Sequence, residues 1–216
     1  MQRTSRTLVK WVGAVSLAAG LIAAAPAVTF AKHLAPRPRL FSRSWQIKFV
    51  WHTPTRLFYM SGAGNQMQLR KYWYLTYTIM NQTHRDLYFT PSFQLRLDNG
   101  RLISPVVGVT PLLCRAVKRA TGNPFLIDPD MVSGKLLQGA DNAKDSFAIF
   151  SRVPSGIRGF KIFITGLSGE TAIQKDPLNG KPVVLHKTLV LDYHIPGHAI
   201  NIAPQPILVK KYWVMR

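Results

Sequence analysis

The chain has 216 residues, of which 47% are hydrophobic and 11% aromatic, which suits one folded domain with a sizeable core and excludes a wholly disordered chain. It carries 28 Lys and Arg residues against 9 Asp and Glu residues. Its single cysteine, Cys114, excludes a fold held together by intramolecular disulfide bonds and is expected to be an inert thiol in the core.

The first 31 residues have the three parts of a secretory signal peptide. Arg3, Arg6 and Lys10 form a basic start, an uncharged apolar run follows, and small residues precede a cleavage position. We expect residues 1–31 to be cleaved and the protein to be exported, to the periplasm or the extracellular space. The alternative is an uncleaved N-terminal membrane anchor, because the apolar run is about long enough to cross a bilayer.

The remainder of the chain is expected to consist of a short linker, residues 32–44, and one domain, residues 45–216. Without the signal peptide it keeps 25 basic and 9 acidic residues, a formal charge of +16. The positive charge therefore belongs to the folded body. Such a surface attracts anions, so the expected partner is an acidic protein, lipid or glycan of the cell envelope.

Apolar residues alternate with polar ones through most of the body, which is typical of half-buried strands. Residues 71–80 are bulky on both faces, as expected of a central strand that is covered on both sides. The pattern predicts strands over residues 45–51, 57–60, 71–80, 87–89, 93–97, 146–150, 160–164, 185–193 and 207–214.

Only one stretch has the signals of a helix. Residues 111–120 begin with proline and are followed by Gly122. Residues 98–101 (DNGR) predict a hairpin turn, and the Gly- and Pro-containing residues 123–142 and the polar residues 166–180 are expected to be loops. Seven to nine strands without regular crossover helices predict an all-β fold: an antiparallel, immunoglobulin-like β-sandwich with one short helix and long loops.

Three blocks carry a family resemblance. Residues 71–83 (KYWYLTYTIMNQT) resemble the opening strand and turn of exported immunoglobulin-like modules. Residues 163–168 (FITGLS) and 187–193 (KTLVLDY) resemble blocks in uncharacterised exported proteins of planctomycete-type bacteria. The resemblance implies the fold and the compartment, and it assigns no catalytic residue.

No strong catalytic signature occurs in the sequence, neither a nucleophile elbow nor a metalloprotease helix nor a phosphate-binding glycine loop. We therefore expect a non-enzymatic protein without a cofactor. An unfamiliar hydrolase remains as an alternative, and it requires a concave pocket that holds two acids or an acid and a histidine.

A second alternative is a metal-binding exported protein. Asp192 and His194 share one strand face, His186 lies further along it, and a Pro-Gly turn could bring His198 back, so these four side chains could bind zinc or copper. A copper site with soft thioether ligands could use His52, Met60, Met67, Met80 and His84. We expect those methionines to pack in the core instead.

Basic residues gather at three places in the sequence. They are Arg70 and Lys71, then Arg115, Lys118 and Arg119 on the predicted helix, and finally Lys210 and Lys211. The first and last groups adjoin aromatic residues, as in nucleic-acid platforms, but the signal peptide argues against that partner. The sequence predicts an exported binding or scaffold module, a possible subunit of a larger assembly, whose basic surface holds an acidic partner.

Overall fold

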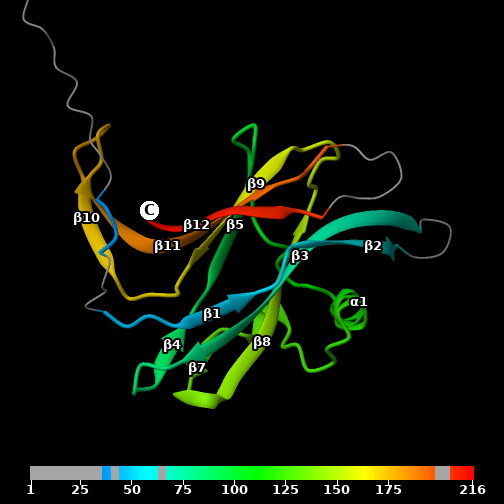
Figure 1. Ribbon diagram of the computed structural model, residues 1–216, viewed down its shortest axis with the longest axis horizontal. Coiled ribbons are helices and arrows are strands. Elements are labelled where there is room, and N and C mark those ends of the chain that lie inside the picture. Colours follow the sequence, from blue (N-terminus) through cyan, green and yellow to red (C-terminus); the bar gives the residue numbers. More distant parts are fainter. Residues whose placement is uncertain (1–35, 40–43, 63–66, 198–204) are drawn as a thin grey trace, which may run out of the picture. The chain divides into compact units, whose positions relative to one another are not determined.

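The computed structural model describes residues 36–39, 44–62, 67–197 and 205–216, so the predicted signal peptide and His198 lie outside the described residues. The chain divides into two units, Met1–His33 and Leu34–Arg216, and every described residue belongs to the second unit. Figure 1 shows two layers of strands, with one helix beside the lower layer.

The described residues form twelve strands, one α-helix and one short 3-10 turn. The strands are β1 (Lys48–Trp51), β2 (Thr55–Ser61), β3 (Gln68–Asn81), β4 (Leu87–Phe89), β5 (Ser92–Leu97), β6 (Leu102–Ile103), β7 (Gly134–Leu136), β8 (Gly139–Ser151), β9 (Gly159–Thr165), β10 (Thr171–Lys175), β11 (Pro182–His194) and β12 (Ile207–Met215). The helix is α1 (Pro111–Thr121), and the 3-10 turn is η2 (Pro129–Met131).

The first sheet is built around β3. β8 pairs antiparallel with β3 from Tyr72 to Asn81, whereas β2 pairs with Gln68–Tyr74 and β1 with Tyr77–Met80. Because a strand has only two edges, β1 and β2 share the edge of β3 that faces away from β8. A small separate pair, β4 and β7, adjoins this sheet through the bridge of Asn81 to Gln138.

The second sheet is built around β11. β12 pairs with β11 over Lys187–His194, while β9 pairs with Leu189–His194 and β10 with Pro182–His186. β5 pairs with β9, and β6 pairs with β5 across the turn that contains Gly100, whose φ is +85°. The hairpin predicted at residues 98–101 is therefore confirmed.

The two sheets face each other across one hydrophobic core, which confirms the predicted antiparallel β-sandwich. The odd-numbered residues 73–79 of β3 point into this core, where the ring centroids of Trp73 and Phe160 lie 5.4 Å apart and those of Tyr77 and Phe93 lie 5.1 Å apart. Period-two alternation puts the even-numbered residues of β3 on the opposite, outer face.

The helix α1 covers that outer face of the first sheet. It begins after Thr110, whose side chain accepts a hydrogen bond from Leu113 N, and ends at Gly122, whose φ is +66°. Its buried face of Leu113, Cys114 and Val117 packs in a second core with Tyr72, Tyr74, Phe147 and Ile149. The predicted helix and the buried cysteine are confirmed.

Two segments expected to be loops contain strands. Residues 123–142 hold β7 and the start of β8, and residues 166–180 hold β10. In β10 and the start of β8 the pattern was hidden because these residues lie largely in solvent: Ile173 in β10 is 74% exposed, and residues 140–143 of β8 are all exposed. Burial imposes alternation only where a face is covered.

Candidate functional site

A pocket of about 540 Å³ opens where β8 leaves β3, and we call it the basic pocket. The pairing of the two strands ends at Tyr72 and Ser151, and the next residue, Arg152, adopts a positive φ of 59°. The described residues that line the basic pocket are Gln68, Arg70, Lys71, Tyr72, Val106, Ser151, Arg152 and Val153. Three of these residues are cations, and none is an acid.

Two of the three cations of the basic pocket, Arg70 and Arg152, are exposed, and Lys71 is partly buried. The Lys71 Nζ donates a hydrogen bond of 2.8 Å to Ser155 Oγ, and burial, followed by the positive charge of Arg56, lowers the pKa of Lys71. Arg101 donates a hydrogen bond of 2.8 Å to the carbonyl oxygen of Arg152, which holds that backbone in place. The three cations would attract an anion to this pocket, so the arrangement favours a carboxylate or a phosphate.

The remaining residues of the predicted basic groups lie elsewhere. On α1, Arg115 and Arg119 are exposed, while Lys118 forms an ion pair of 3.0 Å with Asp128. Lys210 and Lys211 point to opposite faces of β12, and each lies over an aromatic ring. Of the seven predicted residues, only Arg70 and Lys71 line the basic pocket, where as neighbours on β3 they project from opposite faces of the strand.

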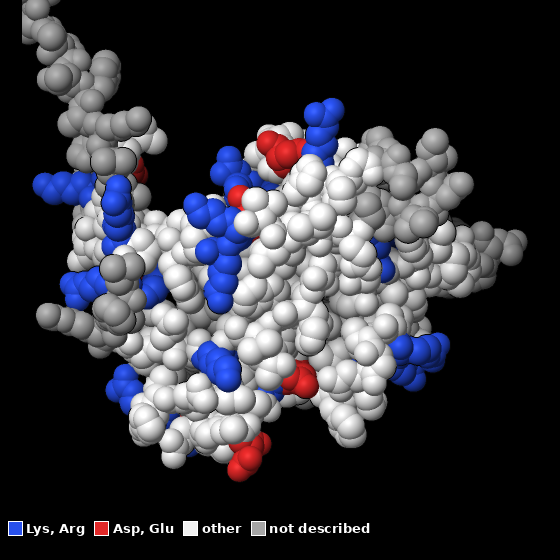
Figure 2. Space-filling model, in the orientation of Figure 1, with Lys and Arg blue, Asp and Glu red and all other residues white. Residues whose placement is uncertain are grey.

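Sequence reasoning missed Arg152. Its place beside Arg70 and Lys71 follows from the register of β8 against β3, which joins residues about 80 positions apart in the chain. Figure 2 shows that Lys and Arg side chains are spread over the visible face, with few acids among them. Charge alone therefore does not single out a site, whereas a pocket that holds three cations does.

The predicted zinc or copper residues are not brought together in the described part of the chain. His186 and Asp192 lie six residues apart on β11, which corresponds to about 20 Å along a strand. Asp192 forms an ion pair with Lys161 and shares the exposed end of the strand with His194. Within the described residues, no group of three or more His, Cys, Asp or Glu side chains is placed to hold a metal ion.

The residues of the copper site with thioether ligands are also dispersed. Met60 and Met67 are 46% and 49% exposed near the β2–β3 connection, so the expectation that they pack in the core is wrong. Their neighbours Phe58 and Leu69 are exposed as well, because the second sheet does not cover this end of the β2–β3 pair. His52 instead contacts Thr76 on the adjacent strand.

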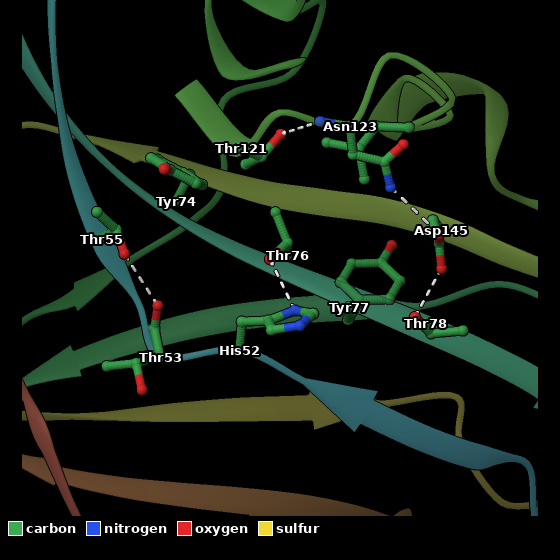
Figure 3. Close-up of a pocket in the computed structure, with 11 residues that line it drawn as sticks. His52, Thr53, Thr55, Tyr74, Thr76, Tyr77, Thr78, Thr121, Asn123 and Asp145 are labelled. Carbon is green, nitrogen blue, oxygen red and sulfur yellow. Dashed lines mark hydrogen bonds between the residues drawn. The ribbon is translucent and has the colours of Figure 1, made fainter. Parts of the chain in front are cut away.

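A second pocket, of about 400 Å³, lies on the outer face of the first sheet near the end of α1 (Figure 3). We call it the threonine pocket. Its lining is His52, Thr53, Thr55, Tyr74, Thr76, Tyr77, Thr78, Thr121, Asn123, Leu126 and Asp145. Thr76 and Thr78 were recognised in the sequence only as alternating strand residues, because the polar groups around them come from β2, β8 and the end of α1.

Short hydrogen bonds order the threonine pocket. Thr76 Oγ1 lies 3.1 Å from His52 Nδ1, and Thr78 Oγ1 donates a bond of 2.6 Å to Asp145 Oδ1. Asn123 Nδ2 donates a bond of 3.3 Å to the other oxygen, Asp145 Oδ2. The pocket thus contains the acid and the histidine required by the hydrolase alternative, but they contact different threonines, and the described hydrogen bonds include none between them.

The single cysteine lines neither pocket and is poorly suited to act as a nucleophile. Cys114 is 2% exposed in the core beneath α1. Burial, followed by the negative charge of Asp128, raises the pKa of the thiol to about 11. The reactive thiolate is therefore scarce near neutral pH.

Comparisons with known proteins give little. No family model and no curated protein matches the chain. The structure is similar to that of the yjhA protein from Bacillus subtilis, with 13% sequence identity, a TM-score of 0.37, and coverage of 70% of this chain and 97% of that chain. No helix in the described ranges has the length and apolar character needed to cross a bilayer.

Proposed function

We propose that this chain is an exported, non-enzymatic binding or scaffold module that holds an acidic group of a cell-envelope partner in the basic pocket. The observation that carries the proposal is that Arg70, Lys71 and Arg152 line one pocket whose described lining contains no acid. A lining of this charge attracts anions, and a bound anion would supply the counter-charge that the described lining lacks.

The chemistry of the pocket favours a partner that carries carboxylates or phosphates. The guanidinium groups of Arg70 and Arg152 can each donate two parallel hydrogen bonds to such a group, and Lys71 adds a point charge. An acidic protein, an anionic lipid and an acidic glycan all present these groups. The formal charge of +16 on residues 32–216 would also suit a subunit that lies between acidic neighbours in a larger assembly.

The test measures binding of the purified protein to three separate probes: immobilised poly-L-glutamate, vesicles that contain phosphatidylglycerol, and alginate. We expect binding to at least one probe, with affinity falling steeply as the salt concentration rises. The triple substitution R70Q/K71Q/R152Q should weaken that binding by about tenfold or more, because it removes the charged donors of the pocket.

The matched control is R85Q/K175Q/K181Q, which removes the same net charge from exposed residues outside the basic pocket. We expect the affinity of this variant to lie within about threefold of that of the unchanged protein, because the variant loses only long-range electrostatic attraction. Equal losses in the two variants would assign binding to net charge rather than to the pocket. Binding that ignores salt, or no binding to any probe, would contradict the proposal.

A further inference from the structure

We propose that the threonine pocket is a separate binding site for a neutral sugar ring. The inference does not depend on the function of the basic pocket. It starts from the composition of the lining, which contains five threonines, one asparagine, one aspartate and one histidine but no lysine or arginine. In a chain with 28 basic residues, a cavity lined without any of them is unsuited to an acidic ligand.

The polar groups of this pocket match the hydroxyl groups of a sugar. A sugar hydroxyl both donates and accepts. The hydroxyls of Thr55, Thr78 and Thr121 already donate within the protein, so they offer a ligand acceptor lone pairs. The amide of Asn123 and the ring of His52 add a donor and a further donor or acceptor. His52 uses Nδ1 toward Thr76, which leaves Nε2 on the other side of the imidazole for a ligand.

Asp145 is the strongest acceptor in the threonine pocket. Thr78 and Asn123 each donate to a different oxygen of its carboxylate, which fixes the plane of the group. An ionised carboxylate has about four lone-pair sites, so both oxygens can still accept bonds from a ligand. Two neighbouring hydroxyls of a sugar ring present donors at the spacing of these two oxygens, and bonds to a charged acceptor are strong.

The shape and rigidity of the pocket also fit a sugar. Tyr74 and Leu126, both largely buried, form an apolar part of the wall against which the C–H groups of a ring can pack. A volume of about 400 Å³ is at the small end of the range for ligand sites, about 300–1,000 Å³. Thr78 and Asp145 are direct partners in the β3–β8 pair, so the central groups are held by the sheet before any ligand arrives.

The experiment uses saturation-transfer difference NMR with the purified protein and four probes: the methyl glycosides of glucose, galactose, mannose and N-acetylglucosamine. We expect at least one probe to bind with a dissociation constant on the order of 1 mM, as befits a ligand of this size. Asp145→Asn should weaken binding by about tenfold, through the loss of a charged acceptor.

Three further variants test whether the glycoside binds in the threonine pocket. His52→Ala changes an exposed residue and should weaken binding by about threefold without affecting the fold, consistent with the loss of one neutral hydrogen bond. Asp141→Asn on β8 and Thr171→Val on β10 are exposed residues outside the pocket, and they should leave binding unchanged. The absence of a signal with all four glycosides, or binding that survives both Asp145→Asn and His52→Ala, would overturn the proposal.

Discussion

Glu170 is the only glutamate in the chain, and it forms a buried ion pair. Its Oε2 lies 3.0 Å from Lys187 Nζ, and the two side chains are 10% and 3% exposed. Its other oxygen accepts a bond of 2.8 Å from the backbone N–H of Arg39, and Lys187 lies over the ring of Trp213. The carboxylate thus ties residue 39, in the segment expected to be a linker, to the second sheet.

Glu170→Gln should therefore lower the free energy of unfolding by about 3 kcal/mol, because it leaves Lys187 buried without its counter-charge. Asp86→Asn is the control, since the Asp86–Lys135 pair is 39% and 65% exposed and its loss should cost less than about 1 kcal/mol. Urea unfolding of both variants gives the comparison. Equal effects would show that the Glu170 pair behaves as a surface contact.

Single residues were the hardest part to predict from the sequence. Cys114 was correctly assigned to the core, because apolar residues surround it in the chain. The partners of Lys187 and Asp145 could not be foreseen, since each contact joins strands that are distant in sequence. The same reason hid Arg152 and the whole threonine pocket.

At the scale of elements, α1 is attached to the first sheet by one buried stripe. Val117 is fully buried against that sheet, whereas Leu112 on the other side of the helix is 57% exposed. Val117→Ala should lower the free energy of unfolding by about 2 kcal/mol through the cavity it creates, and Leu112→Ala by less than about 0.5 kcal/mol. Chemical unfolding measures both, and similar losses would mean that the helix does not pack as described.

Elements were predictable wherever burial or a cap constrained the sequence. β3 was recognised because both of its faces are covered, and α1 because a proline and a glycine mark its ends. β10 was missed because its side chains lie largely in solvent and its pairing with β11 uses only backbone groups. A strand stabilised in that way leaves little trace in the order of apolar residues.

At the scale of the molecule, the core between the two sheets contains two tyrosines that must stay neutral. Burial raises the pKa of Tyr77, on the first sheet, and of Tyr193, on the second sheet, to about 12 from the ordinary value of 10.0. The folded state thus favours the protonated phenols. Their contribution is complete below pH 10 and is lost as the pH rises from 10 through 12.

We therefore expect the free energy of unfolding to fall as the pH rises above 10, and urea titrations at a series of pH values measure the slope. Tyr77→Phe and Tyr193→Phe remove the ionisable groups, so each should make the decline shallower even where it lowers stability at neutral pH. An unaltered slope in both core variants would assign the alkaline loss to other groups.

The sandwich architecture was predictable because period-two alternation repeats along the chain and regular crossover helices between the strands are lacking. The strand order and the register within each sheet were not predictable, because register depends on which strands lie next to each other. Export, the partner and the family resemblance remain predictions. Residues 1–31 lie outside the described part, and the comparisons name no partner.

The position of α1 has a consequence for ligands that are longer than one group. The helix lies over Tyr72 and Tyr74, and these two residues border the basic pocket and the threonine pocket respectively. Arg70 and Thr76 are six residues apart on β3, about 20 Å. A polymer long enough to cross the helix would bind in both pockets at once and so with avidity. Two short chains, one in each pocket, would instead be cross-linked by a single protein molecule.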